Sequence, residues 1–407
     1  MLKIGDVIVV LVSFAIALVV LNPRMIKWRA WRATVTPLAS IIGSGFLVAG
    51  PILSHLAGSW AWVAILGLCA IGYFYGTAIR HNIRFVEPQL GRNAPRGLWF
   101  IEEISDLSLS LAYFVSVAYY LNLFAAFALR GGNIVDPFWI KMLATLMIGG
   151  IGCMGILRGL GALEKIETLA VGIKLSLIGG LCSTLAIVSM MAFSTGDFSW
   201  PVLEHTTGIA EAQVFLGLVI LVQGFETSRY LGNEYEPELR ITSMRWAQIL
   251  STAIYLIFIL LVTRYFDNGL PQTGGETAII DLLRPVGVLV APLIIVTALA
   301  SQLSAAVADM NGAGGLVAEI GKVRLPVKFG YAATAVAAIF ITWVANIYEI
   351  ITYASKAFVI YYGLQSLQAA LSSARQKGAV RQLWAWFYGI GVVLALVIVI
   401  FAIPAEV

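Results

Sequence analysis

The chain consists of long apolar segments joined by short polar connections, and this pattern restricts it to a small set of folds. A hydrocarbon core of about 30 Å needs about 20 helical residues. On that measure there are twelve candidate spans, and only 12% of the residues are charged, too few for a soluble surface. The sequence therefore predicts an all-α polytopic membrane protein with twelve transmembrane helices. The spans lie near residues 5–22, 34–57, 60–80, 99–129, 137–157, 164–193, 208–231, 244–265, 286–316, 328–345, 348–370 and 383–403.

Lysine and arginine are distributed unevenly among the connections. If Met1 lies outside, the inside connections hold 19 of the 26 basic residues and the outside connections hold 5, while Lys174 and Lys356 lie within spans. The positive-inside rule then predicts a multi-pass protein of the cell membrane with both termini outside. Cleavage of the first span as a signal peptide is disfavoured, because its basic cluster follows the apolar run instead of preceding it.

One span has a weak centre. The stretch TPLASIIGSGFLVAGPIL, residues 36–53, carries Gly43-Ser44-Gly45 in its middle, and each glycine costs about 1 kcal/mol of helix propensity. Transporters use broken helices of this kind at the membrane midplane, in two repeats of inverted topology. The alternative is a patch of small residues for helix packing, which is common in membrane bundles.

A second weak centre lies in a span of the opposite direction. The stretch LVILVQGFETSRYLGNEY places Gly224 and Glu226 well inside an apolar run. Two breaks in opposed spans predict a 5+5 inverted repeat with two broken helices, plus one extra N-terminal and one C-terminal helix. The expected organisation is an extra helix with a basic loop (1–32), a first repeat (33–193), a second repeat (207–370) and a C-terminal helix (383–407).

These motifs resemble a known family. IIGSGFLVAGPIL is similar to the first core helix of the amino acid–polyamine–organocation superfamily, which has the leucine-transporter-like fold. GFETSRYLGNEYEPELRITSMRWA resembles its sixth core helix and the following loop, and SQLSAAVADMNGAGGLVAEIGKVRLP resembles its eighth core helix. The resemblance covers about residues 33–370. The sequence departs from the family pattern at Phe46, in a loop one residue shorter after Glu234, and in the extra N-terminal span, which leaves the substrate open.

The two breaks predict a substrate site with two electrical poles. At the first break, Gly43, Ser44 and Gly45 would present unpaired N–H groups to a carboxylate, and the carbonyls of Ile41 and Ile42 would accept from an ammonium group or a cation. A zwitterionic amino acid fits such poles.

At the second break, carbonyls near Gln223, Gly224 and Phe225 would again accept from an ammonium group or a cation. Glu226 would pair with a cationic substrate or a coupling proton, and the resemblance implies that this carboxylate lies near the substrate. The alternative role for Glu226 is a structural carboxylate satisfied by neighbouring backbone.

Candidate residues for ion coupling lie on two other spans. Lys174 is about 15 Å along its helix from Glu164, too deep for its ammonium to reach water easily. Ser301 and Ser304, about one turn apart, would supply hydroxyl ligands for sodium, or would only bond their own helix backbone. A lysine and a sodium ion at one place would repel each other, so a coupling proton is favoured over sodium.

The leading hypothesis is a secondary active transporter of amino acids or related amines, working by alternating access with a coupling proton. The alternatives are a ligand-sensing receptor on a permease fold, and a sodium-coupled or ion transporter of the same fold. Partners would be a small-molecule substrate and the lipid bilayer, with no nucleic acid, and no cofactor or resident metal is expected. No catalytic constellation indicates an enzyme, and all three cysteines lie in apolar runs.

Overall fold

The computed structural model describes residues 4–90, 96–159, 161–203, 208–232, 234–266, 275–319, 326–375 and 378–405, without the side chains of residues 44 and 161–170. These residues form helices, turns and irregular connections, with no strand in the part described. The long helices are α1 (Ile4–Val20), α3 (Arg29–Ala57), α4 (Ala61–Phe85), α5 (Arg96–Arg130), α6 (Pro137–Arg158), α7 (Gly161–Thr195), α10 (Pro237–Thr263), α12 (Val290–Glu319), α13 (Val327–Val344), α14 (Ile347–Ala374) and α15 (Ala379–Phe401). The short ones are α2 (Pro23–Lys27), η1 (Gly58–Trp60), η2 (Glu87–Gln89), α8 (Ile209–Leu216), η3 (Val219–Val222), α9 (Thr227–Tyr230), η4 (Gly275–Thr277) and α11 (Ile279–Leu282).

Each of the twelve predicted spans overlaps a long helix or, for the seventh, the interrupted segment α8–η3–α9. By length and composition, eight stretches of the described residues can cross a membrane, and one of them, Arg29–Gln89, contains both α3 and α4. The three predicted spans outside these stretches are the short α1, the interrupted segment and α14. Helix α14 buries many polar residues in the protein interior, which lowers its hydropathy; they include Thr352, Ser355, Gln365, Ser366, Gln368, Ser372 and Ser373.

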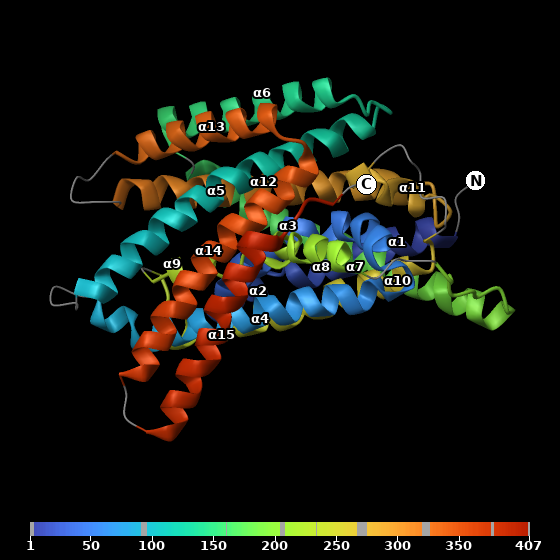
Figure 1. Ribbon diagram of the computed structural model, residues 1–407. Helices are drawn as coiled ribbons and strands as arrows, with labels where there is room; N and C mark the ends of the chain where they lie inside the picture. Colours follow the sequence, from blue (N-terminus) through green and yellow to red (C-terminus); the bar gives the residue numbers. More distant parts are fainter. Residues whose placement is uncertain are drawn as a thin grey trace.

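The helix ends gather at two opposite sides of the molecule. Figure 1 shows the C-terminal ends of α4, α12 and α14 and the N-terminal ends of α5, α13 and α15 toward the left. The N-terminus of the chain and the C-terminal ends of α7 and α10 lie toward the right. These helix ends lie on the sides that the alternating topology requires, and the left side is the one predicted to be cytoplasmic.

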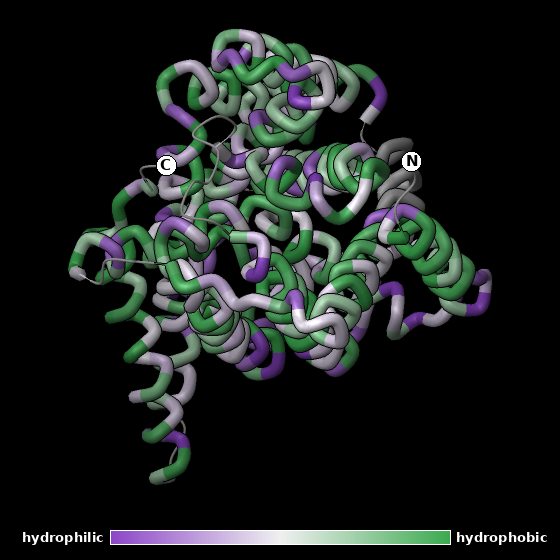
Figure 2. Tube along the Cα trace, turned by 90° about the vertical axis from the view of Figure 1, so that its right-hand side faces the viewer, coloured by the Kyte–Doolittle hydropathy of each residue, from purple (hydrophilic) through white to green (hydrophobic). Residues whose placement is uncertain are grey.

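The centre of the bundle is formed by α3, α4, α5, α10, α12 and α14, which pack against one another around η3. Helix α1 packs on α7, α6 packs on α13, and α15 packs on α14 at the periphery. In Figure 2 the green of hydrophobic residues extends over the outer helices as well as the inner ones. Helices that are apolar on all sides are typical of a protein whose outer surface faces lipid.

The predicted break at Gly43-Ser44-Gly45 is wrong for this structure, because α3 runs as one helix from Arg29 to Ala57. The glycines permit close packing instead. A Cβ built on Gly45 would lie 2.8 Å from the Cα of Leu221, and one on Gly43 would lie 3.1 Å from the Cβ of Ala305. Tertiary packing overrides the weak helix propensity of glycine here, as the alternative of a small-residue patch predicted.

The second predicted break is confirmed. Helix α8 ends at Leu216, η3 covers four residues, and Gln223 is extended with ψ of 169° before α9 begins at Thr227. The interrupted segment lies against α3. The fold thus has one continuous and one interrupted helix where two interrupted helices were expected.

Candidate functional site

Gly224 forms the turn of the interrupted segment. Its φ is +117°, a conformation that side chains rarely adopt. A Cβ at this position would also lie 2.6 Å from the backbone nitrogen of Ile41, so the backbones of the interrupted segment and α3 touch here. Glycine is therefore required both by the backbone conformation and by the space.

Glu226 follows directly and is fully buried. Its Oε2 accepts hydrogen bonds from the backbone N–H of Gly224 at 2.9 Å and from the hydroxyl of Tyr362 at 2.8 Å. Its Oε1 has no hydrogen-bond partner among the described residues. A buried carboxylate oxygen is normally satisfied, so Oε1 is placed to accept from a ligand.

Aromatic rings enclose this carboxylate. Tyr362 of α14 stacks between Phe225 and Tyr75 of α4, with ring centroids 5.0 Å and 5.3 Å away. Phe358, one turn before Tyr362, contacts the edge of Tyr113 on α5. The stacked rings hold the Tyr362 hydroxyl in place against the buried carboxylate.

Gln223 adds a second acceptor. Its side-chain amide donates a hydrogen bond to the hydroxyl of Tyr120 on α5, while its Oε1 has no partner among the described residues. Two neighbouring buried residues thus each present an unpartnered oxygen, which suits a ligand with several N–H donors.

A buried aspartate that the sequence analysis did not single out lies nearby. Asp309 of α12 accepts a hydrogen bond from the hydroxyl of Ser116 on α5. Tyr113 and Tyr120, on the same face of α5, are within electrostatic reach of both Asp309 and Glu226. A lone aspartate inside the apolar span 286–316 was the available signal, because ionisable groups at membrane depth are usually functional.

The predicted α3 residues lie beside the interrupted segment but do not form a second pole. Ile41, Ile42, Gly43 and Gly45 are within the continuous helix, and the side chain of Ser44 lies outside the described residues. The carbonyl groups of Ile41 and Ile42 therefore belong to the interior of a helix. They are not the free groups that the sequence analysis expected.

Tyr255 of α10 links α3 to the interrupted segment. Its hydroxyl lies 3.0 Å from the carbonyl oxygen of Ile41 and 2.6 Å from that of Leu221, so both carbonyls are within reach of its one proton. The contact fixes η3 against the middle of α3.

The structure brings the predicted coupling residues to the other face of α3. The fully buried Lys174 donates from Nζ to the carbonyl oxygen of Ala39 at 2.8 Å. A Cβ on Gly43 would lie 3.6 Å from this Nζ and 3.7 Å from the carbonyl oxygen of Ser301. The Lys174 amine and the backbone of α12 at Ser301 thus both approach Gly43, and Ser304 is buried on the same helix as Ser301.

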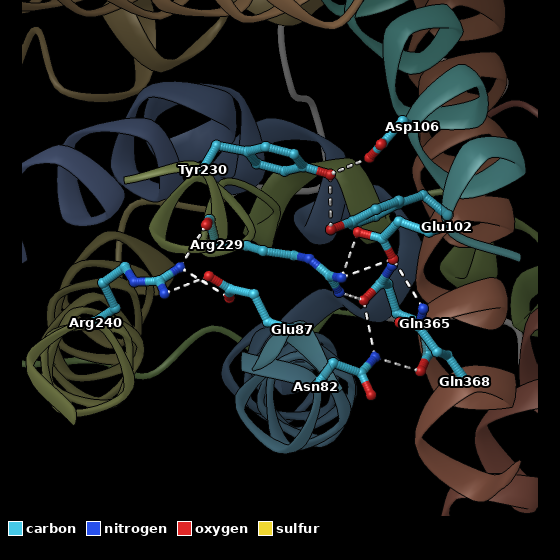
Figure 3. A network of polar contacts seen from close by, with 10 residues as sticks. Asn82, Glu87, Glu102, Asp106, Arg229, Tyr230, Arg240, Gln365 and Gln368 are labelled. Atoms are coloured by element: carbon cyan, nitrogen blue, oxygen red, sulfur yellow. Dashed lines mark hydrogen bonds and ion pairs between the residues drawn. The ribbon is translucent and has the colours of Figure 1, made fainter. Parts of the chain in front are cut away.

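A polar network, drawn in Figure 3, joins α9 to the helices around it. Arg229 of α9 donates from Nη2 to both carboxylate oxygens of Glu102, at 2.6 and 2.8 Å, and from Nη1 to Gln365. Gln368 donates to Glu102 at 2.8 Å, and Asn82 donates to the side chain of Gln365 at 2.9 Å. The network therefore joins α4, α5, α9 and α14.

A second ion pair extends the network to α10. Arg240 donates to Glu87 at 2.6 Å and to the carbonyl oxygen of Arg229 at 2.7 Å. Tyr230 lies 3.2 Å from a carboxylate oxygen of Asp106. Because Glu226 is the N-cap of α9 and Arg229 lies within it, this short helix joins the candidate substrate site to the network. Among the described residues, no three of His, Cys, Asp and Glu come together as metal ligands would.

Comparison with known proteins agrees with this architecture. An "Uncharacterized protein" of Aquifex aeolicus is 40% identical over 374 residues, covering 91% of each chain. The crystal structure of a mutant manganese transporter of Eremococcus coleocola is similar in fold, with a TM-score of 0.58 at 14% identity, covering 91% of this chain and 87% of that one. A family model described as "APC superfamily transporter" matches residues 23–402. These findings identify a multi-pass membrane transporter and not an enzyme: the chain belongs to the APC superfamily.

Proposed function

We propose that this transporter is a secondary active transporter of amino acids or related amines, driven by a proton gradient across the cell membrane. The observation that carries the proposal is the pair of unpartnered acceptor oxygens on Gln223 and Glu226 beside stacked aromatic rings. An ammonium group has three N–H donors and no acceptor, so it suits a site whose unpartnered buried groups are acceptor oxygens.

Coupling would use Lys174. A fully buried ammonium group is costly to keep charged, so movement of α3, whose Ala39 carbonyl it contacts, relative to α7 would change its readiness to release a proton. The α12 backbone at Ser301 and the Lys174 amine both approach Gly43, where a positive lysine disfavours a sodium ion. The geometry supports proton coupling on this ground.

Alternating access would open one side of the bundle at a time. The network around Arg229 and Glu102 is placed to hold the predicted cytoplasmic side closed, and Glu226 is the N-cap of α9, which carries Arg229. Binding at Glu226 would then be transmitted to Arg229 through a single helical turn.

Transport of a divalent metal is the competing function, since the structural neighbour is a manganese transporter. Glu226 presents one free carboxylate oxygen and is surrounded by aromatic rings, which favours an organic cation over a hard metal ion that prefers several oxygen ligands. A ligand-sensing receptor remains the other alternative.

Uptake into proteoliposomes tests the proposal. We expect accumulation of a radiolabelled amino acid or amine, selected by a thermal-shift screen, when the lumen is alkaline and the medium acidic. The accumulation should collapse with a protonophore and persist without sodium. Binding without accumulation would support the receptor, and accumulation of Mn²⁺ alone would support the metal transporter.

A further inference from the structure

Helix α1 lies outside the two predicted repeats, yet it contacts both helices that carry the candidate coupling residues. It packs along α7, which bears Lys174, and it touches α12, which bears Ser301. Its outward side is apolar and exposed, with Leu11, Phe14 and Leu18 each more than 60% exposed. These exposed residues suit lipid, so the inward side of α1 determines how it docks.

Small residues on α7 receive α1. Gly172, Gly179 and Gly180 are separated by seven and eight positions, which places them on one helix face. A Cβ on Gly179 would lie 2.5 Å from Cδ1 of Ile16, and one on Gly180 would lie 3.0 Å from Cβ of Ser13. Side chains larger than glycine would therefore displace α1.

The pairing is antiparallel along the whole of α1. A Cβ on Gly5 would lie 3.5 Å from Thr184 at one end, and Leu21 packs over Gly172 at the other. Lys174 is two residues from Gly172, about 200° around the helix, and so points away from α1. Helix α7 thus holds α1 on one face and presents Lys174 to α3 on the other.

Asp6 connects α1 to the start of α12. Its side chain is fully buried, and Oδ1 accepts a hydrogen bond of 2.7 Å from the backbone N–H of Leu289, directly before Val290 begins α12. A Cβ on Gly287 would collide with the Asp6 carboxylate. A carboxylate in this position satisfies a backbone donor and is stabilised by the helix dipole.

We propose that Asp6 is a positioning residue for ion coupling. Through α1 it holds the start of α12 at a fixed place relative to α7, and so it sets how closely α12, at Ser301, and Lys174 of α7 approach Gly43. The docking follows from the contacts alone, whereas its effect on coupling rests on the proposed proton-coupled transport. Two measurements separate these parts.

The docking is tested by cross-linking in a chain whose three cysteines are changed to alanine. The pair Ser13→Cys and Gly180→Cys should form a disulfide under mild oxidation, because a Cβ at position 180 would lie 3.0 Å from that of residue 13. Displacement of α1 by about 0.5 to 1 Å brings this pair to the Cβ–Cβ separation of a disulfide. The control pair Ser13→Cys and Ile178→Cys should not, since residue 178 lies about 200° around α7 from residue 180. Equal cross-linking of both pairs would overturn the docking.

The effect on coupling is tested with Asp6→Ala, Asp6→Asn and Gly287→Ala in proteoliposomes. Loss of a helix N-cap typically lowers an equilibrium constant for folding about fivefold. Asp6→Ala and Gly287→Ala should lower proton-driven accumulation by about the same factor and shift its pH profile. Asp6→Asn, which keeps an acceptor oxygen for Leu289, should restore most of both. Substrate exchange, which needs no net proton movement, should keep its KM.

Gly287→Ala keeps the Asp6 carboxylate but displaces it, so this variant tests the positioning role if Asp6→Ala does not fold. Unchanged accumulation and an unchanged pH profile in a folded variant of either kind would overturn the positioning role. If the unaltered protein transports nothing, the proposed function fails, and the disulfide still reports whether α1 is docked.

Discussion

Lys174 and Ala39 are joined by a hydrogen bond of 2.8 Å from Nζ to the carbonyl oxygen, across the contact between α7 and α3. The bond places a fully buried amine against the helix that also supports the interrupted segment. We therefore expect Lys174→Ala to abolish uptake driven by a pH gradient while leaving substrate exchange partly intact. Lys328→Ala, which removes an exposed lysine, serves as the control. Undiminished gradient-driven accumulation in Lys174→Ala would remove this residue from the mechanism.

Glu226 is the residue on which substrate affinity should depend most. Glu226→Gln keeps the shape of the side chain but removes the charge, so it weakens the interaction with an ammonium group. A hydrogen bond to a charged group contributes about 2 kcal/mol, which corresponds to a loss of affinity of about 30-fold. Isothermal titration with the transported amine measures the change.

The matched control is Glu238→Gln, which removes a carboxylate that is mostly exposed and pairs only loosely with Arg84. The affinity of Glu238→Gln for the amine should equal that of the unaltered protein. A Glu226→Gln variant that binds the amine as tightly as Glu238→Gln would assign Glu226 a purely structural role.

The ion pair of Arg229 and Glu102 should contribute strongly to stability, because both side chains are largely buried, at 4% and 18% exposed. Arg229→Ala leaves the Glu102 carboxylate without its cation, and breaking a buried pair costs about 3 kcal/mol. A lower melting temperature in detergent should report this loss.

The surface pair of Arg84 and Glu238 is the comparison, with an N–O distance of 3.7 Å and both side chains at least half exposed. Arg84→Ala should cost about 0.5 kcal/mol or less. Equal changes in melting temperature for Arg84→Ala and Arg229→Ala would contradict the view that the network locks this side of the bundle.

Glu276 gives the protein a pH-dependent stability. It lies in η4, in the connection between α10 and α12, where burial raises its pKa above the ordinary value of 4.5. A raised carboxyl pKa in the folded state means that the fold binds the proton more tightly than the unfolded chain does. The stabilisation is complete below pH 4.5 and is lost as the pH rises through the folded pKa.

Glu276→Gln cannot ionise, so its melting temperature should fall less than that of the unaltered protein as the pH rises above 4.5. Thermal unfolding across this range, with Glu238→Gln as the exposed control, measures the difference. Parallel curves for the unaltered protein and Glu276→Gln would show that η4 does not hold this carboxyl in a buried place.

Much of the fold followed from hydropathy alone, because the ends of the twelve apolar runs are physical consequences of bilayer thickness. The break at Gly224 was also predictable, since an ionisable Glu226 so close to a glycine inside an apolar run is too costly to keep without a function. That α3 is continuous at Gly43 was not predictable from the sequence. Glycine serves equally as a weak point and as a contact surface, and the choice depends on Leu221, which is far away in the sequence.

The candidate site, too, could be predicted from the sequence only in part. Tyr362 and Tyr120 complete it from α14 and α5, and nothing in their local sequence separates them from other buried tyrosines. Asp6 was readable as an ionisable residue in an apolar helix, but its partner at Leu289 depends on the packing of α1. Pairings between distant helices are set by tertiary contacts that a one-dimensional pattern does not contain.

Gly224 and Gly149 offer a direct test of why glycine occurs where it does. Gly224 has a φ of +117° and lies against the backbone of α3, whereas Gly149 lies within α6 with open space around it. Gly224→Ala should abolish transport and lower the melting temperature, because the new methyl group meets the Ile41 nitrogen and neither backbone can move freely. Gly149→Ala should stabilise the protein by about 0.5 to 1 kcal/mol, because alanine favours a helix interior. Normal uptake by Gly224→Ala would mean that the interrupted segment can leave α3 without loss of function, and the substrate site built on that contact would then have to be abandoned.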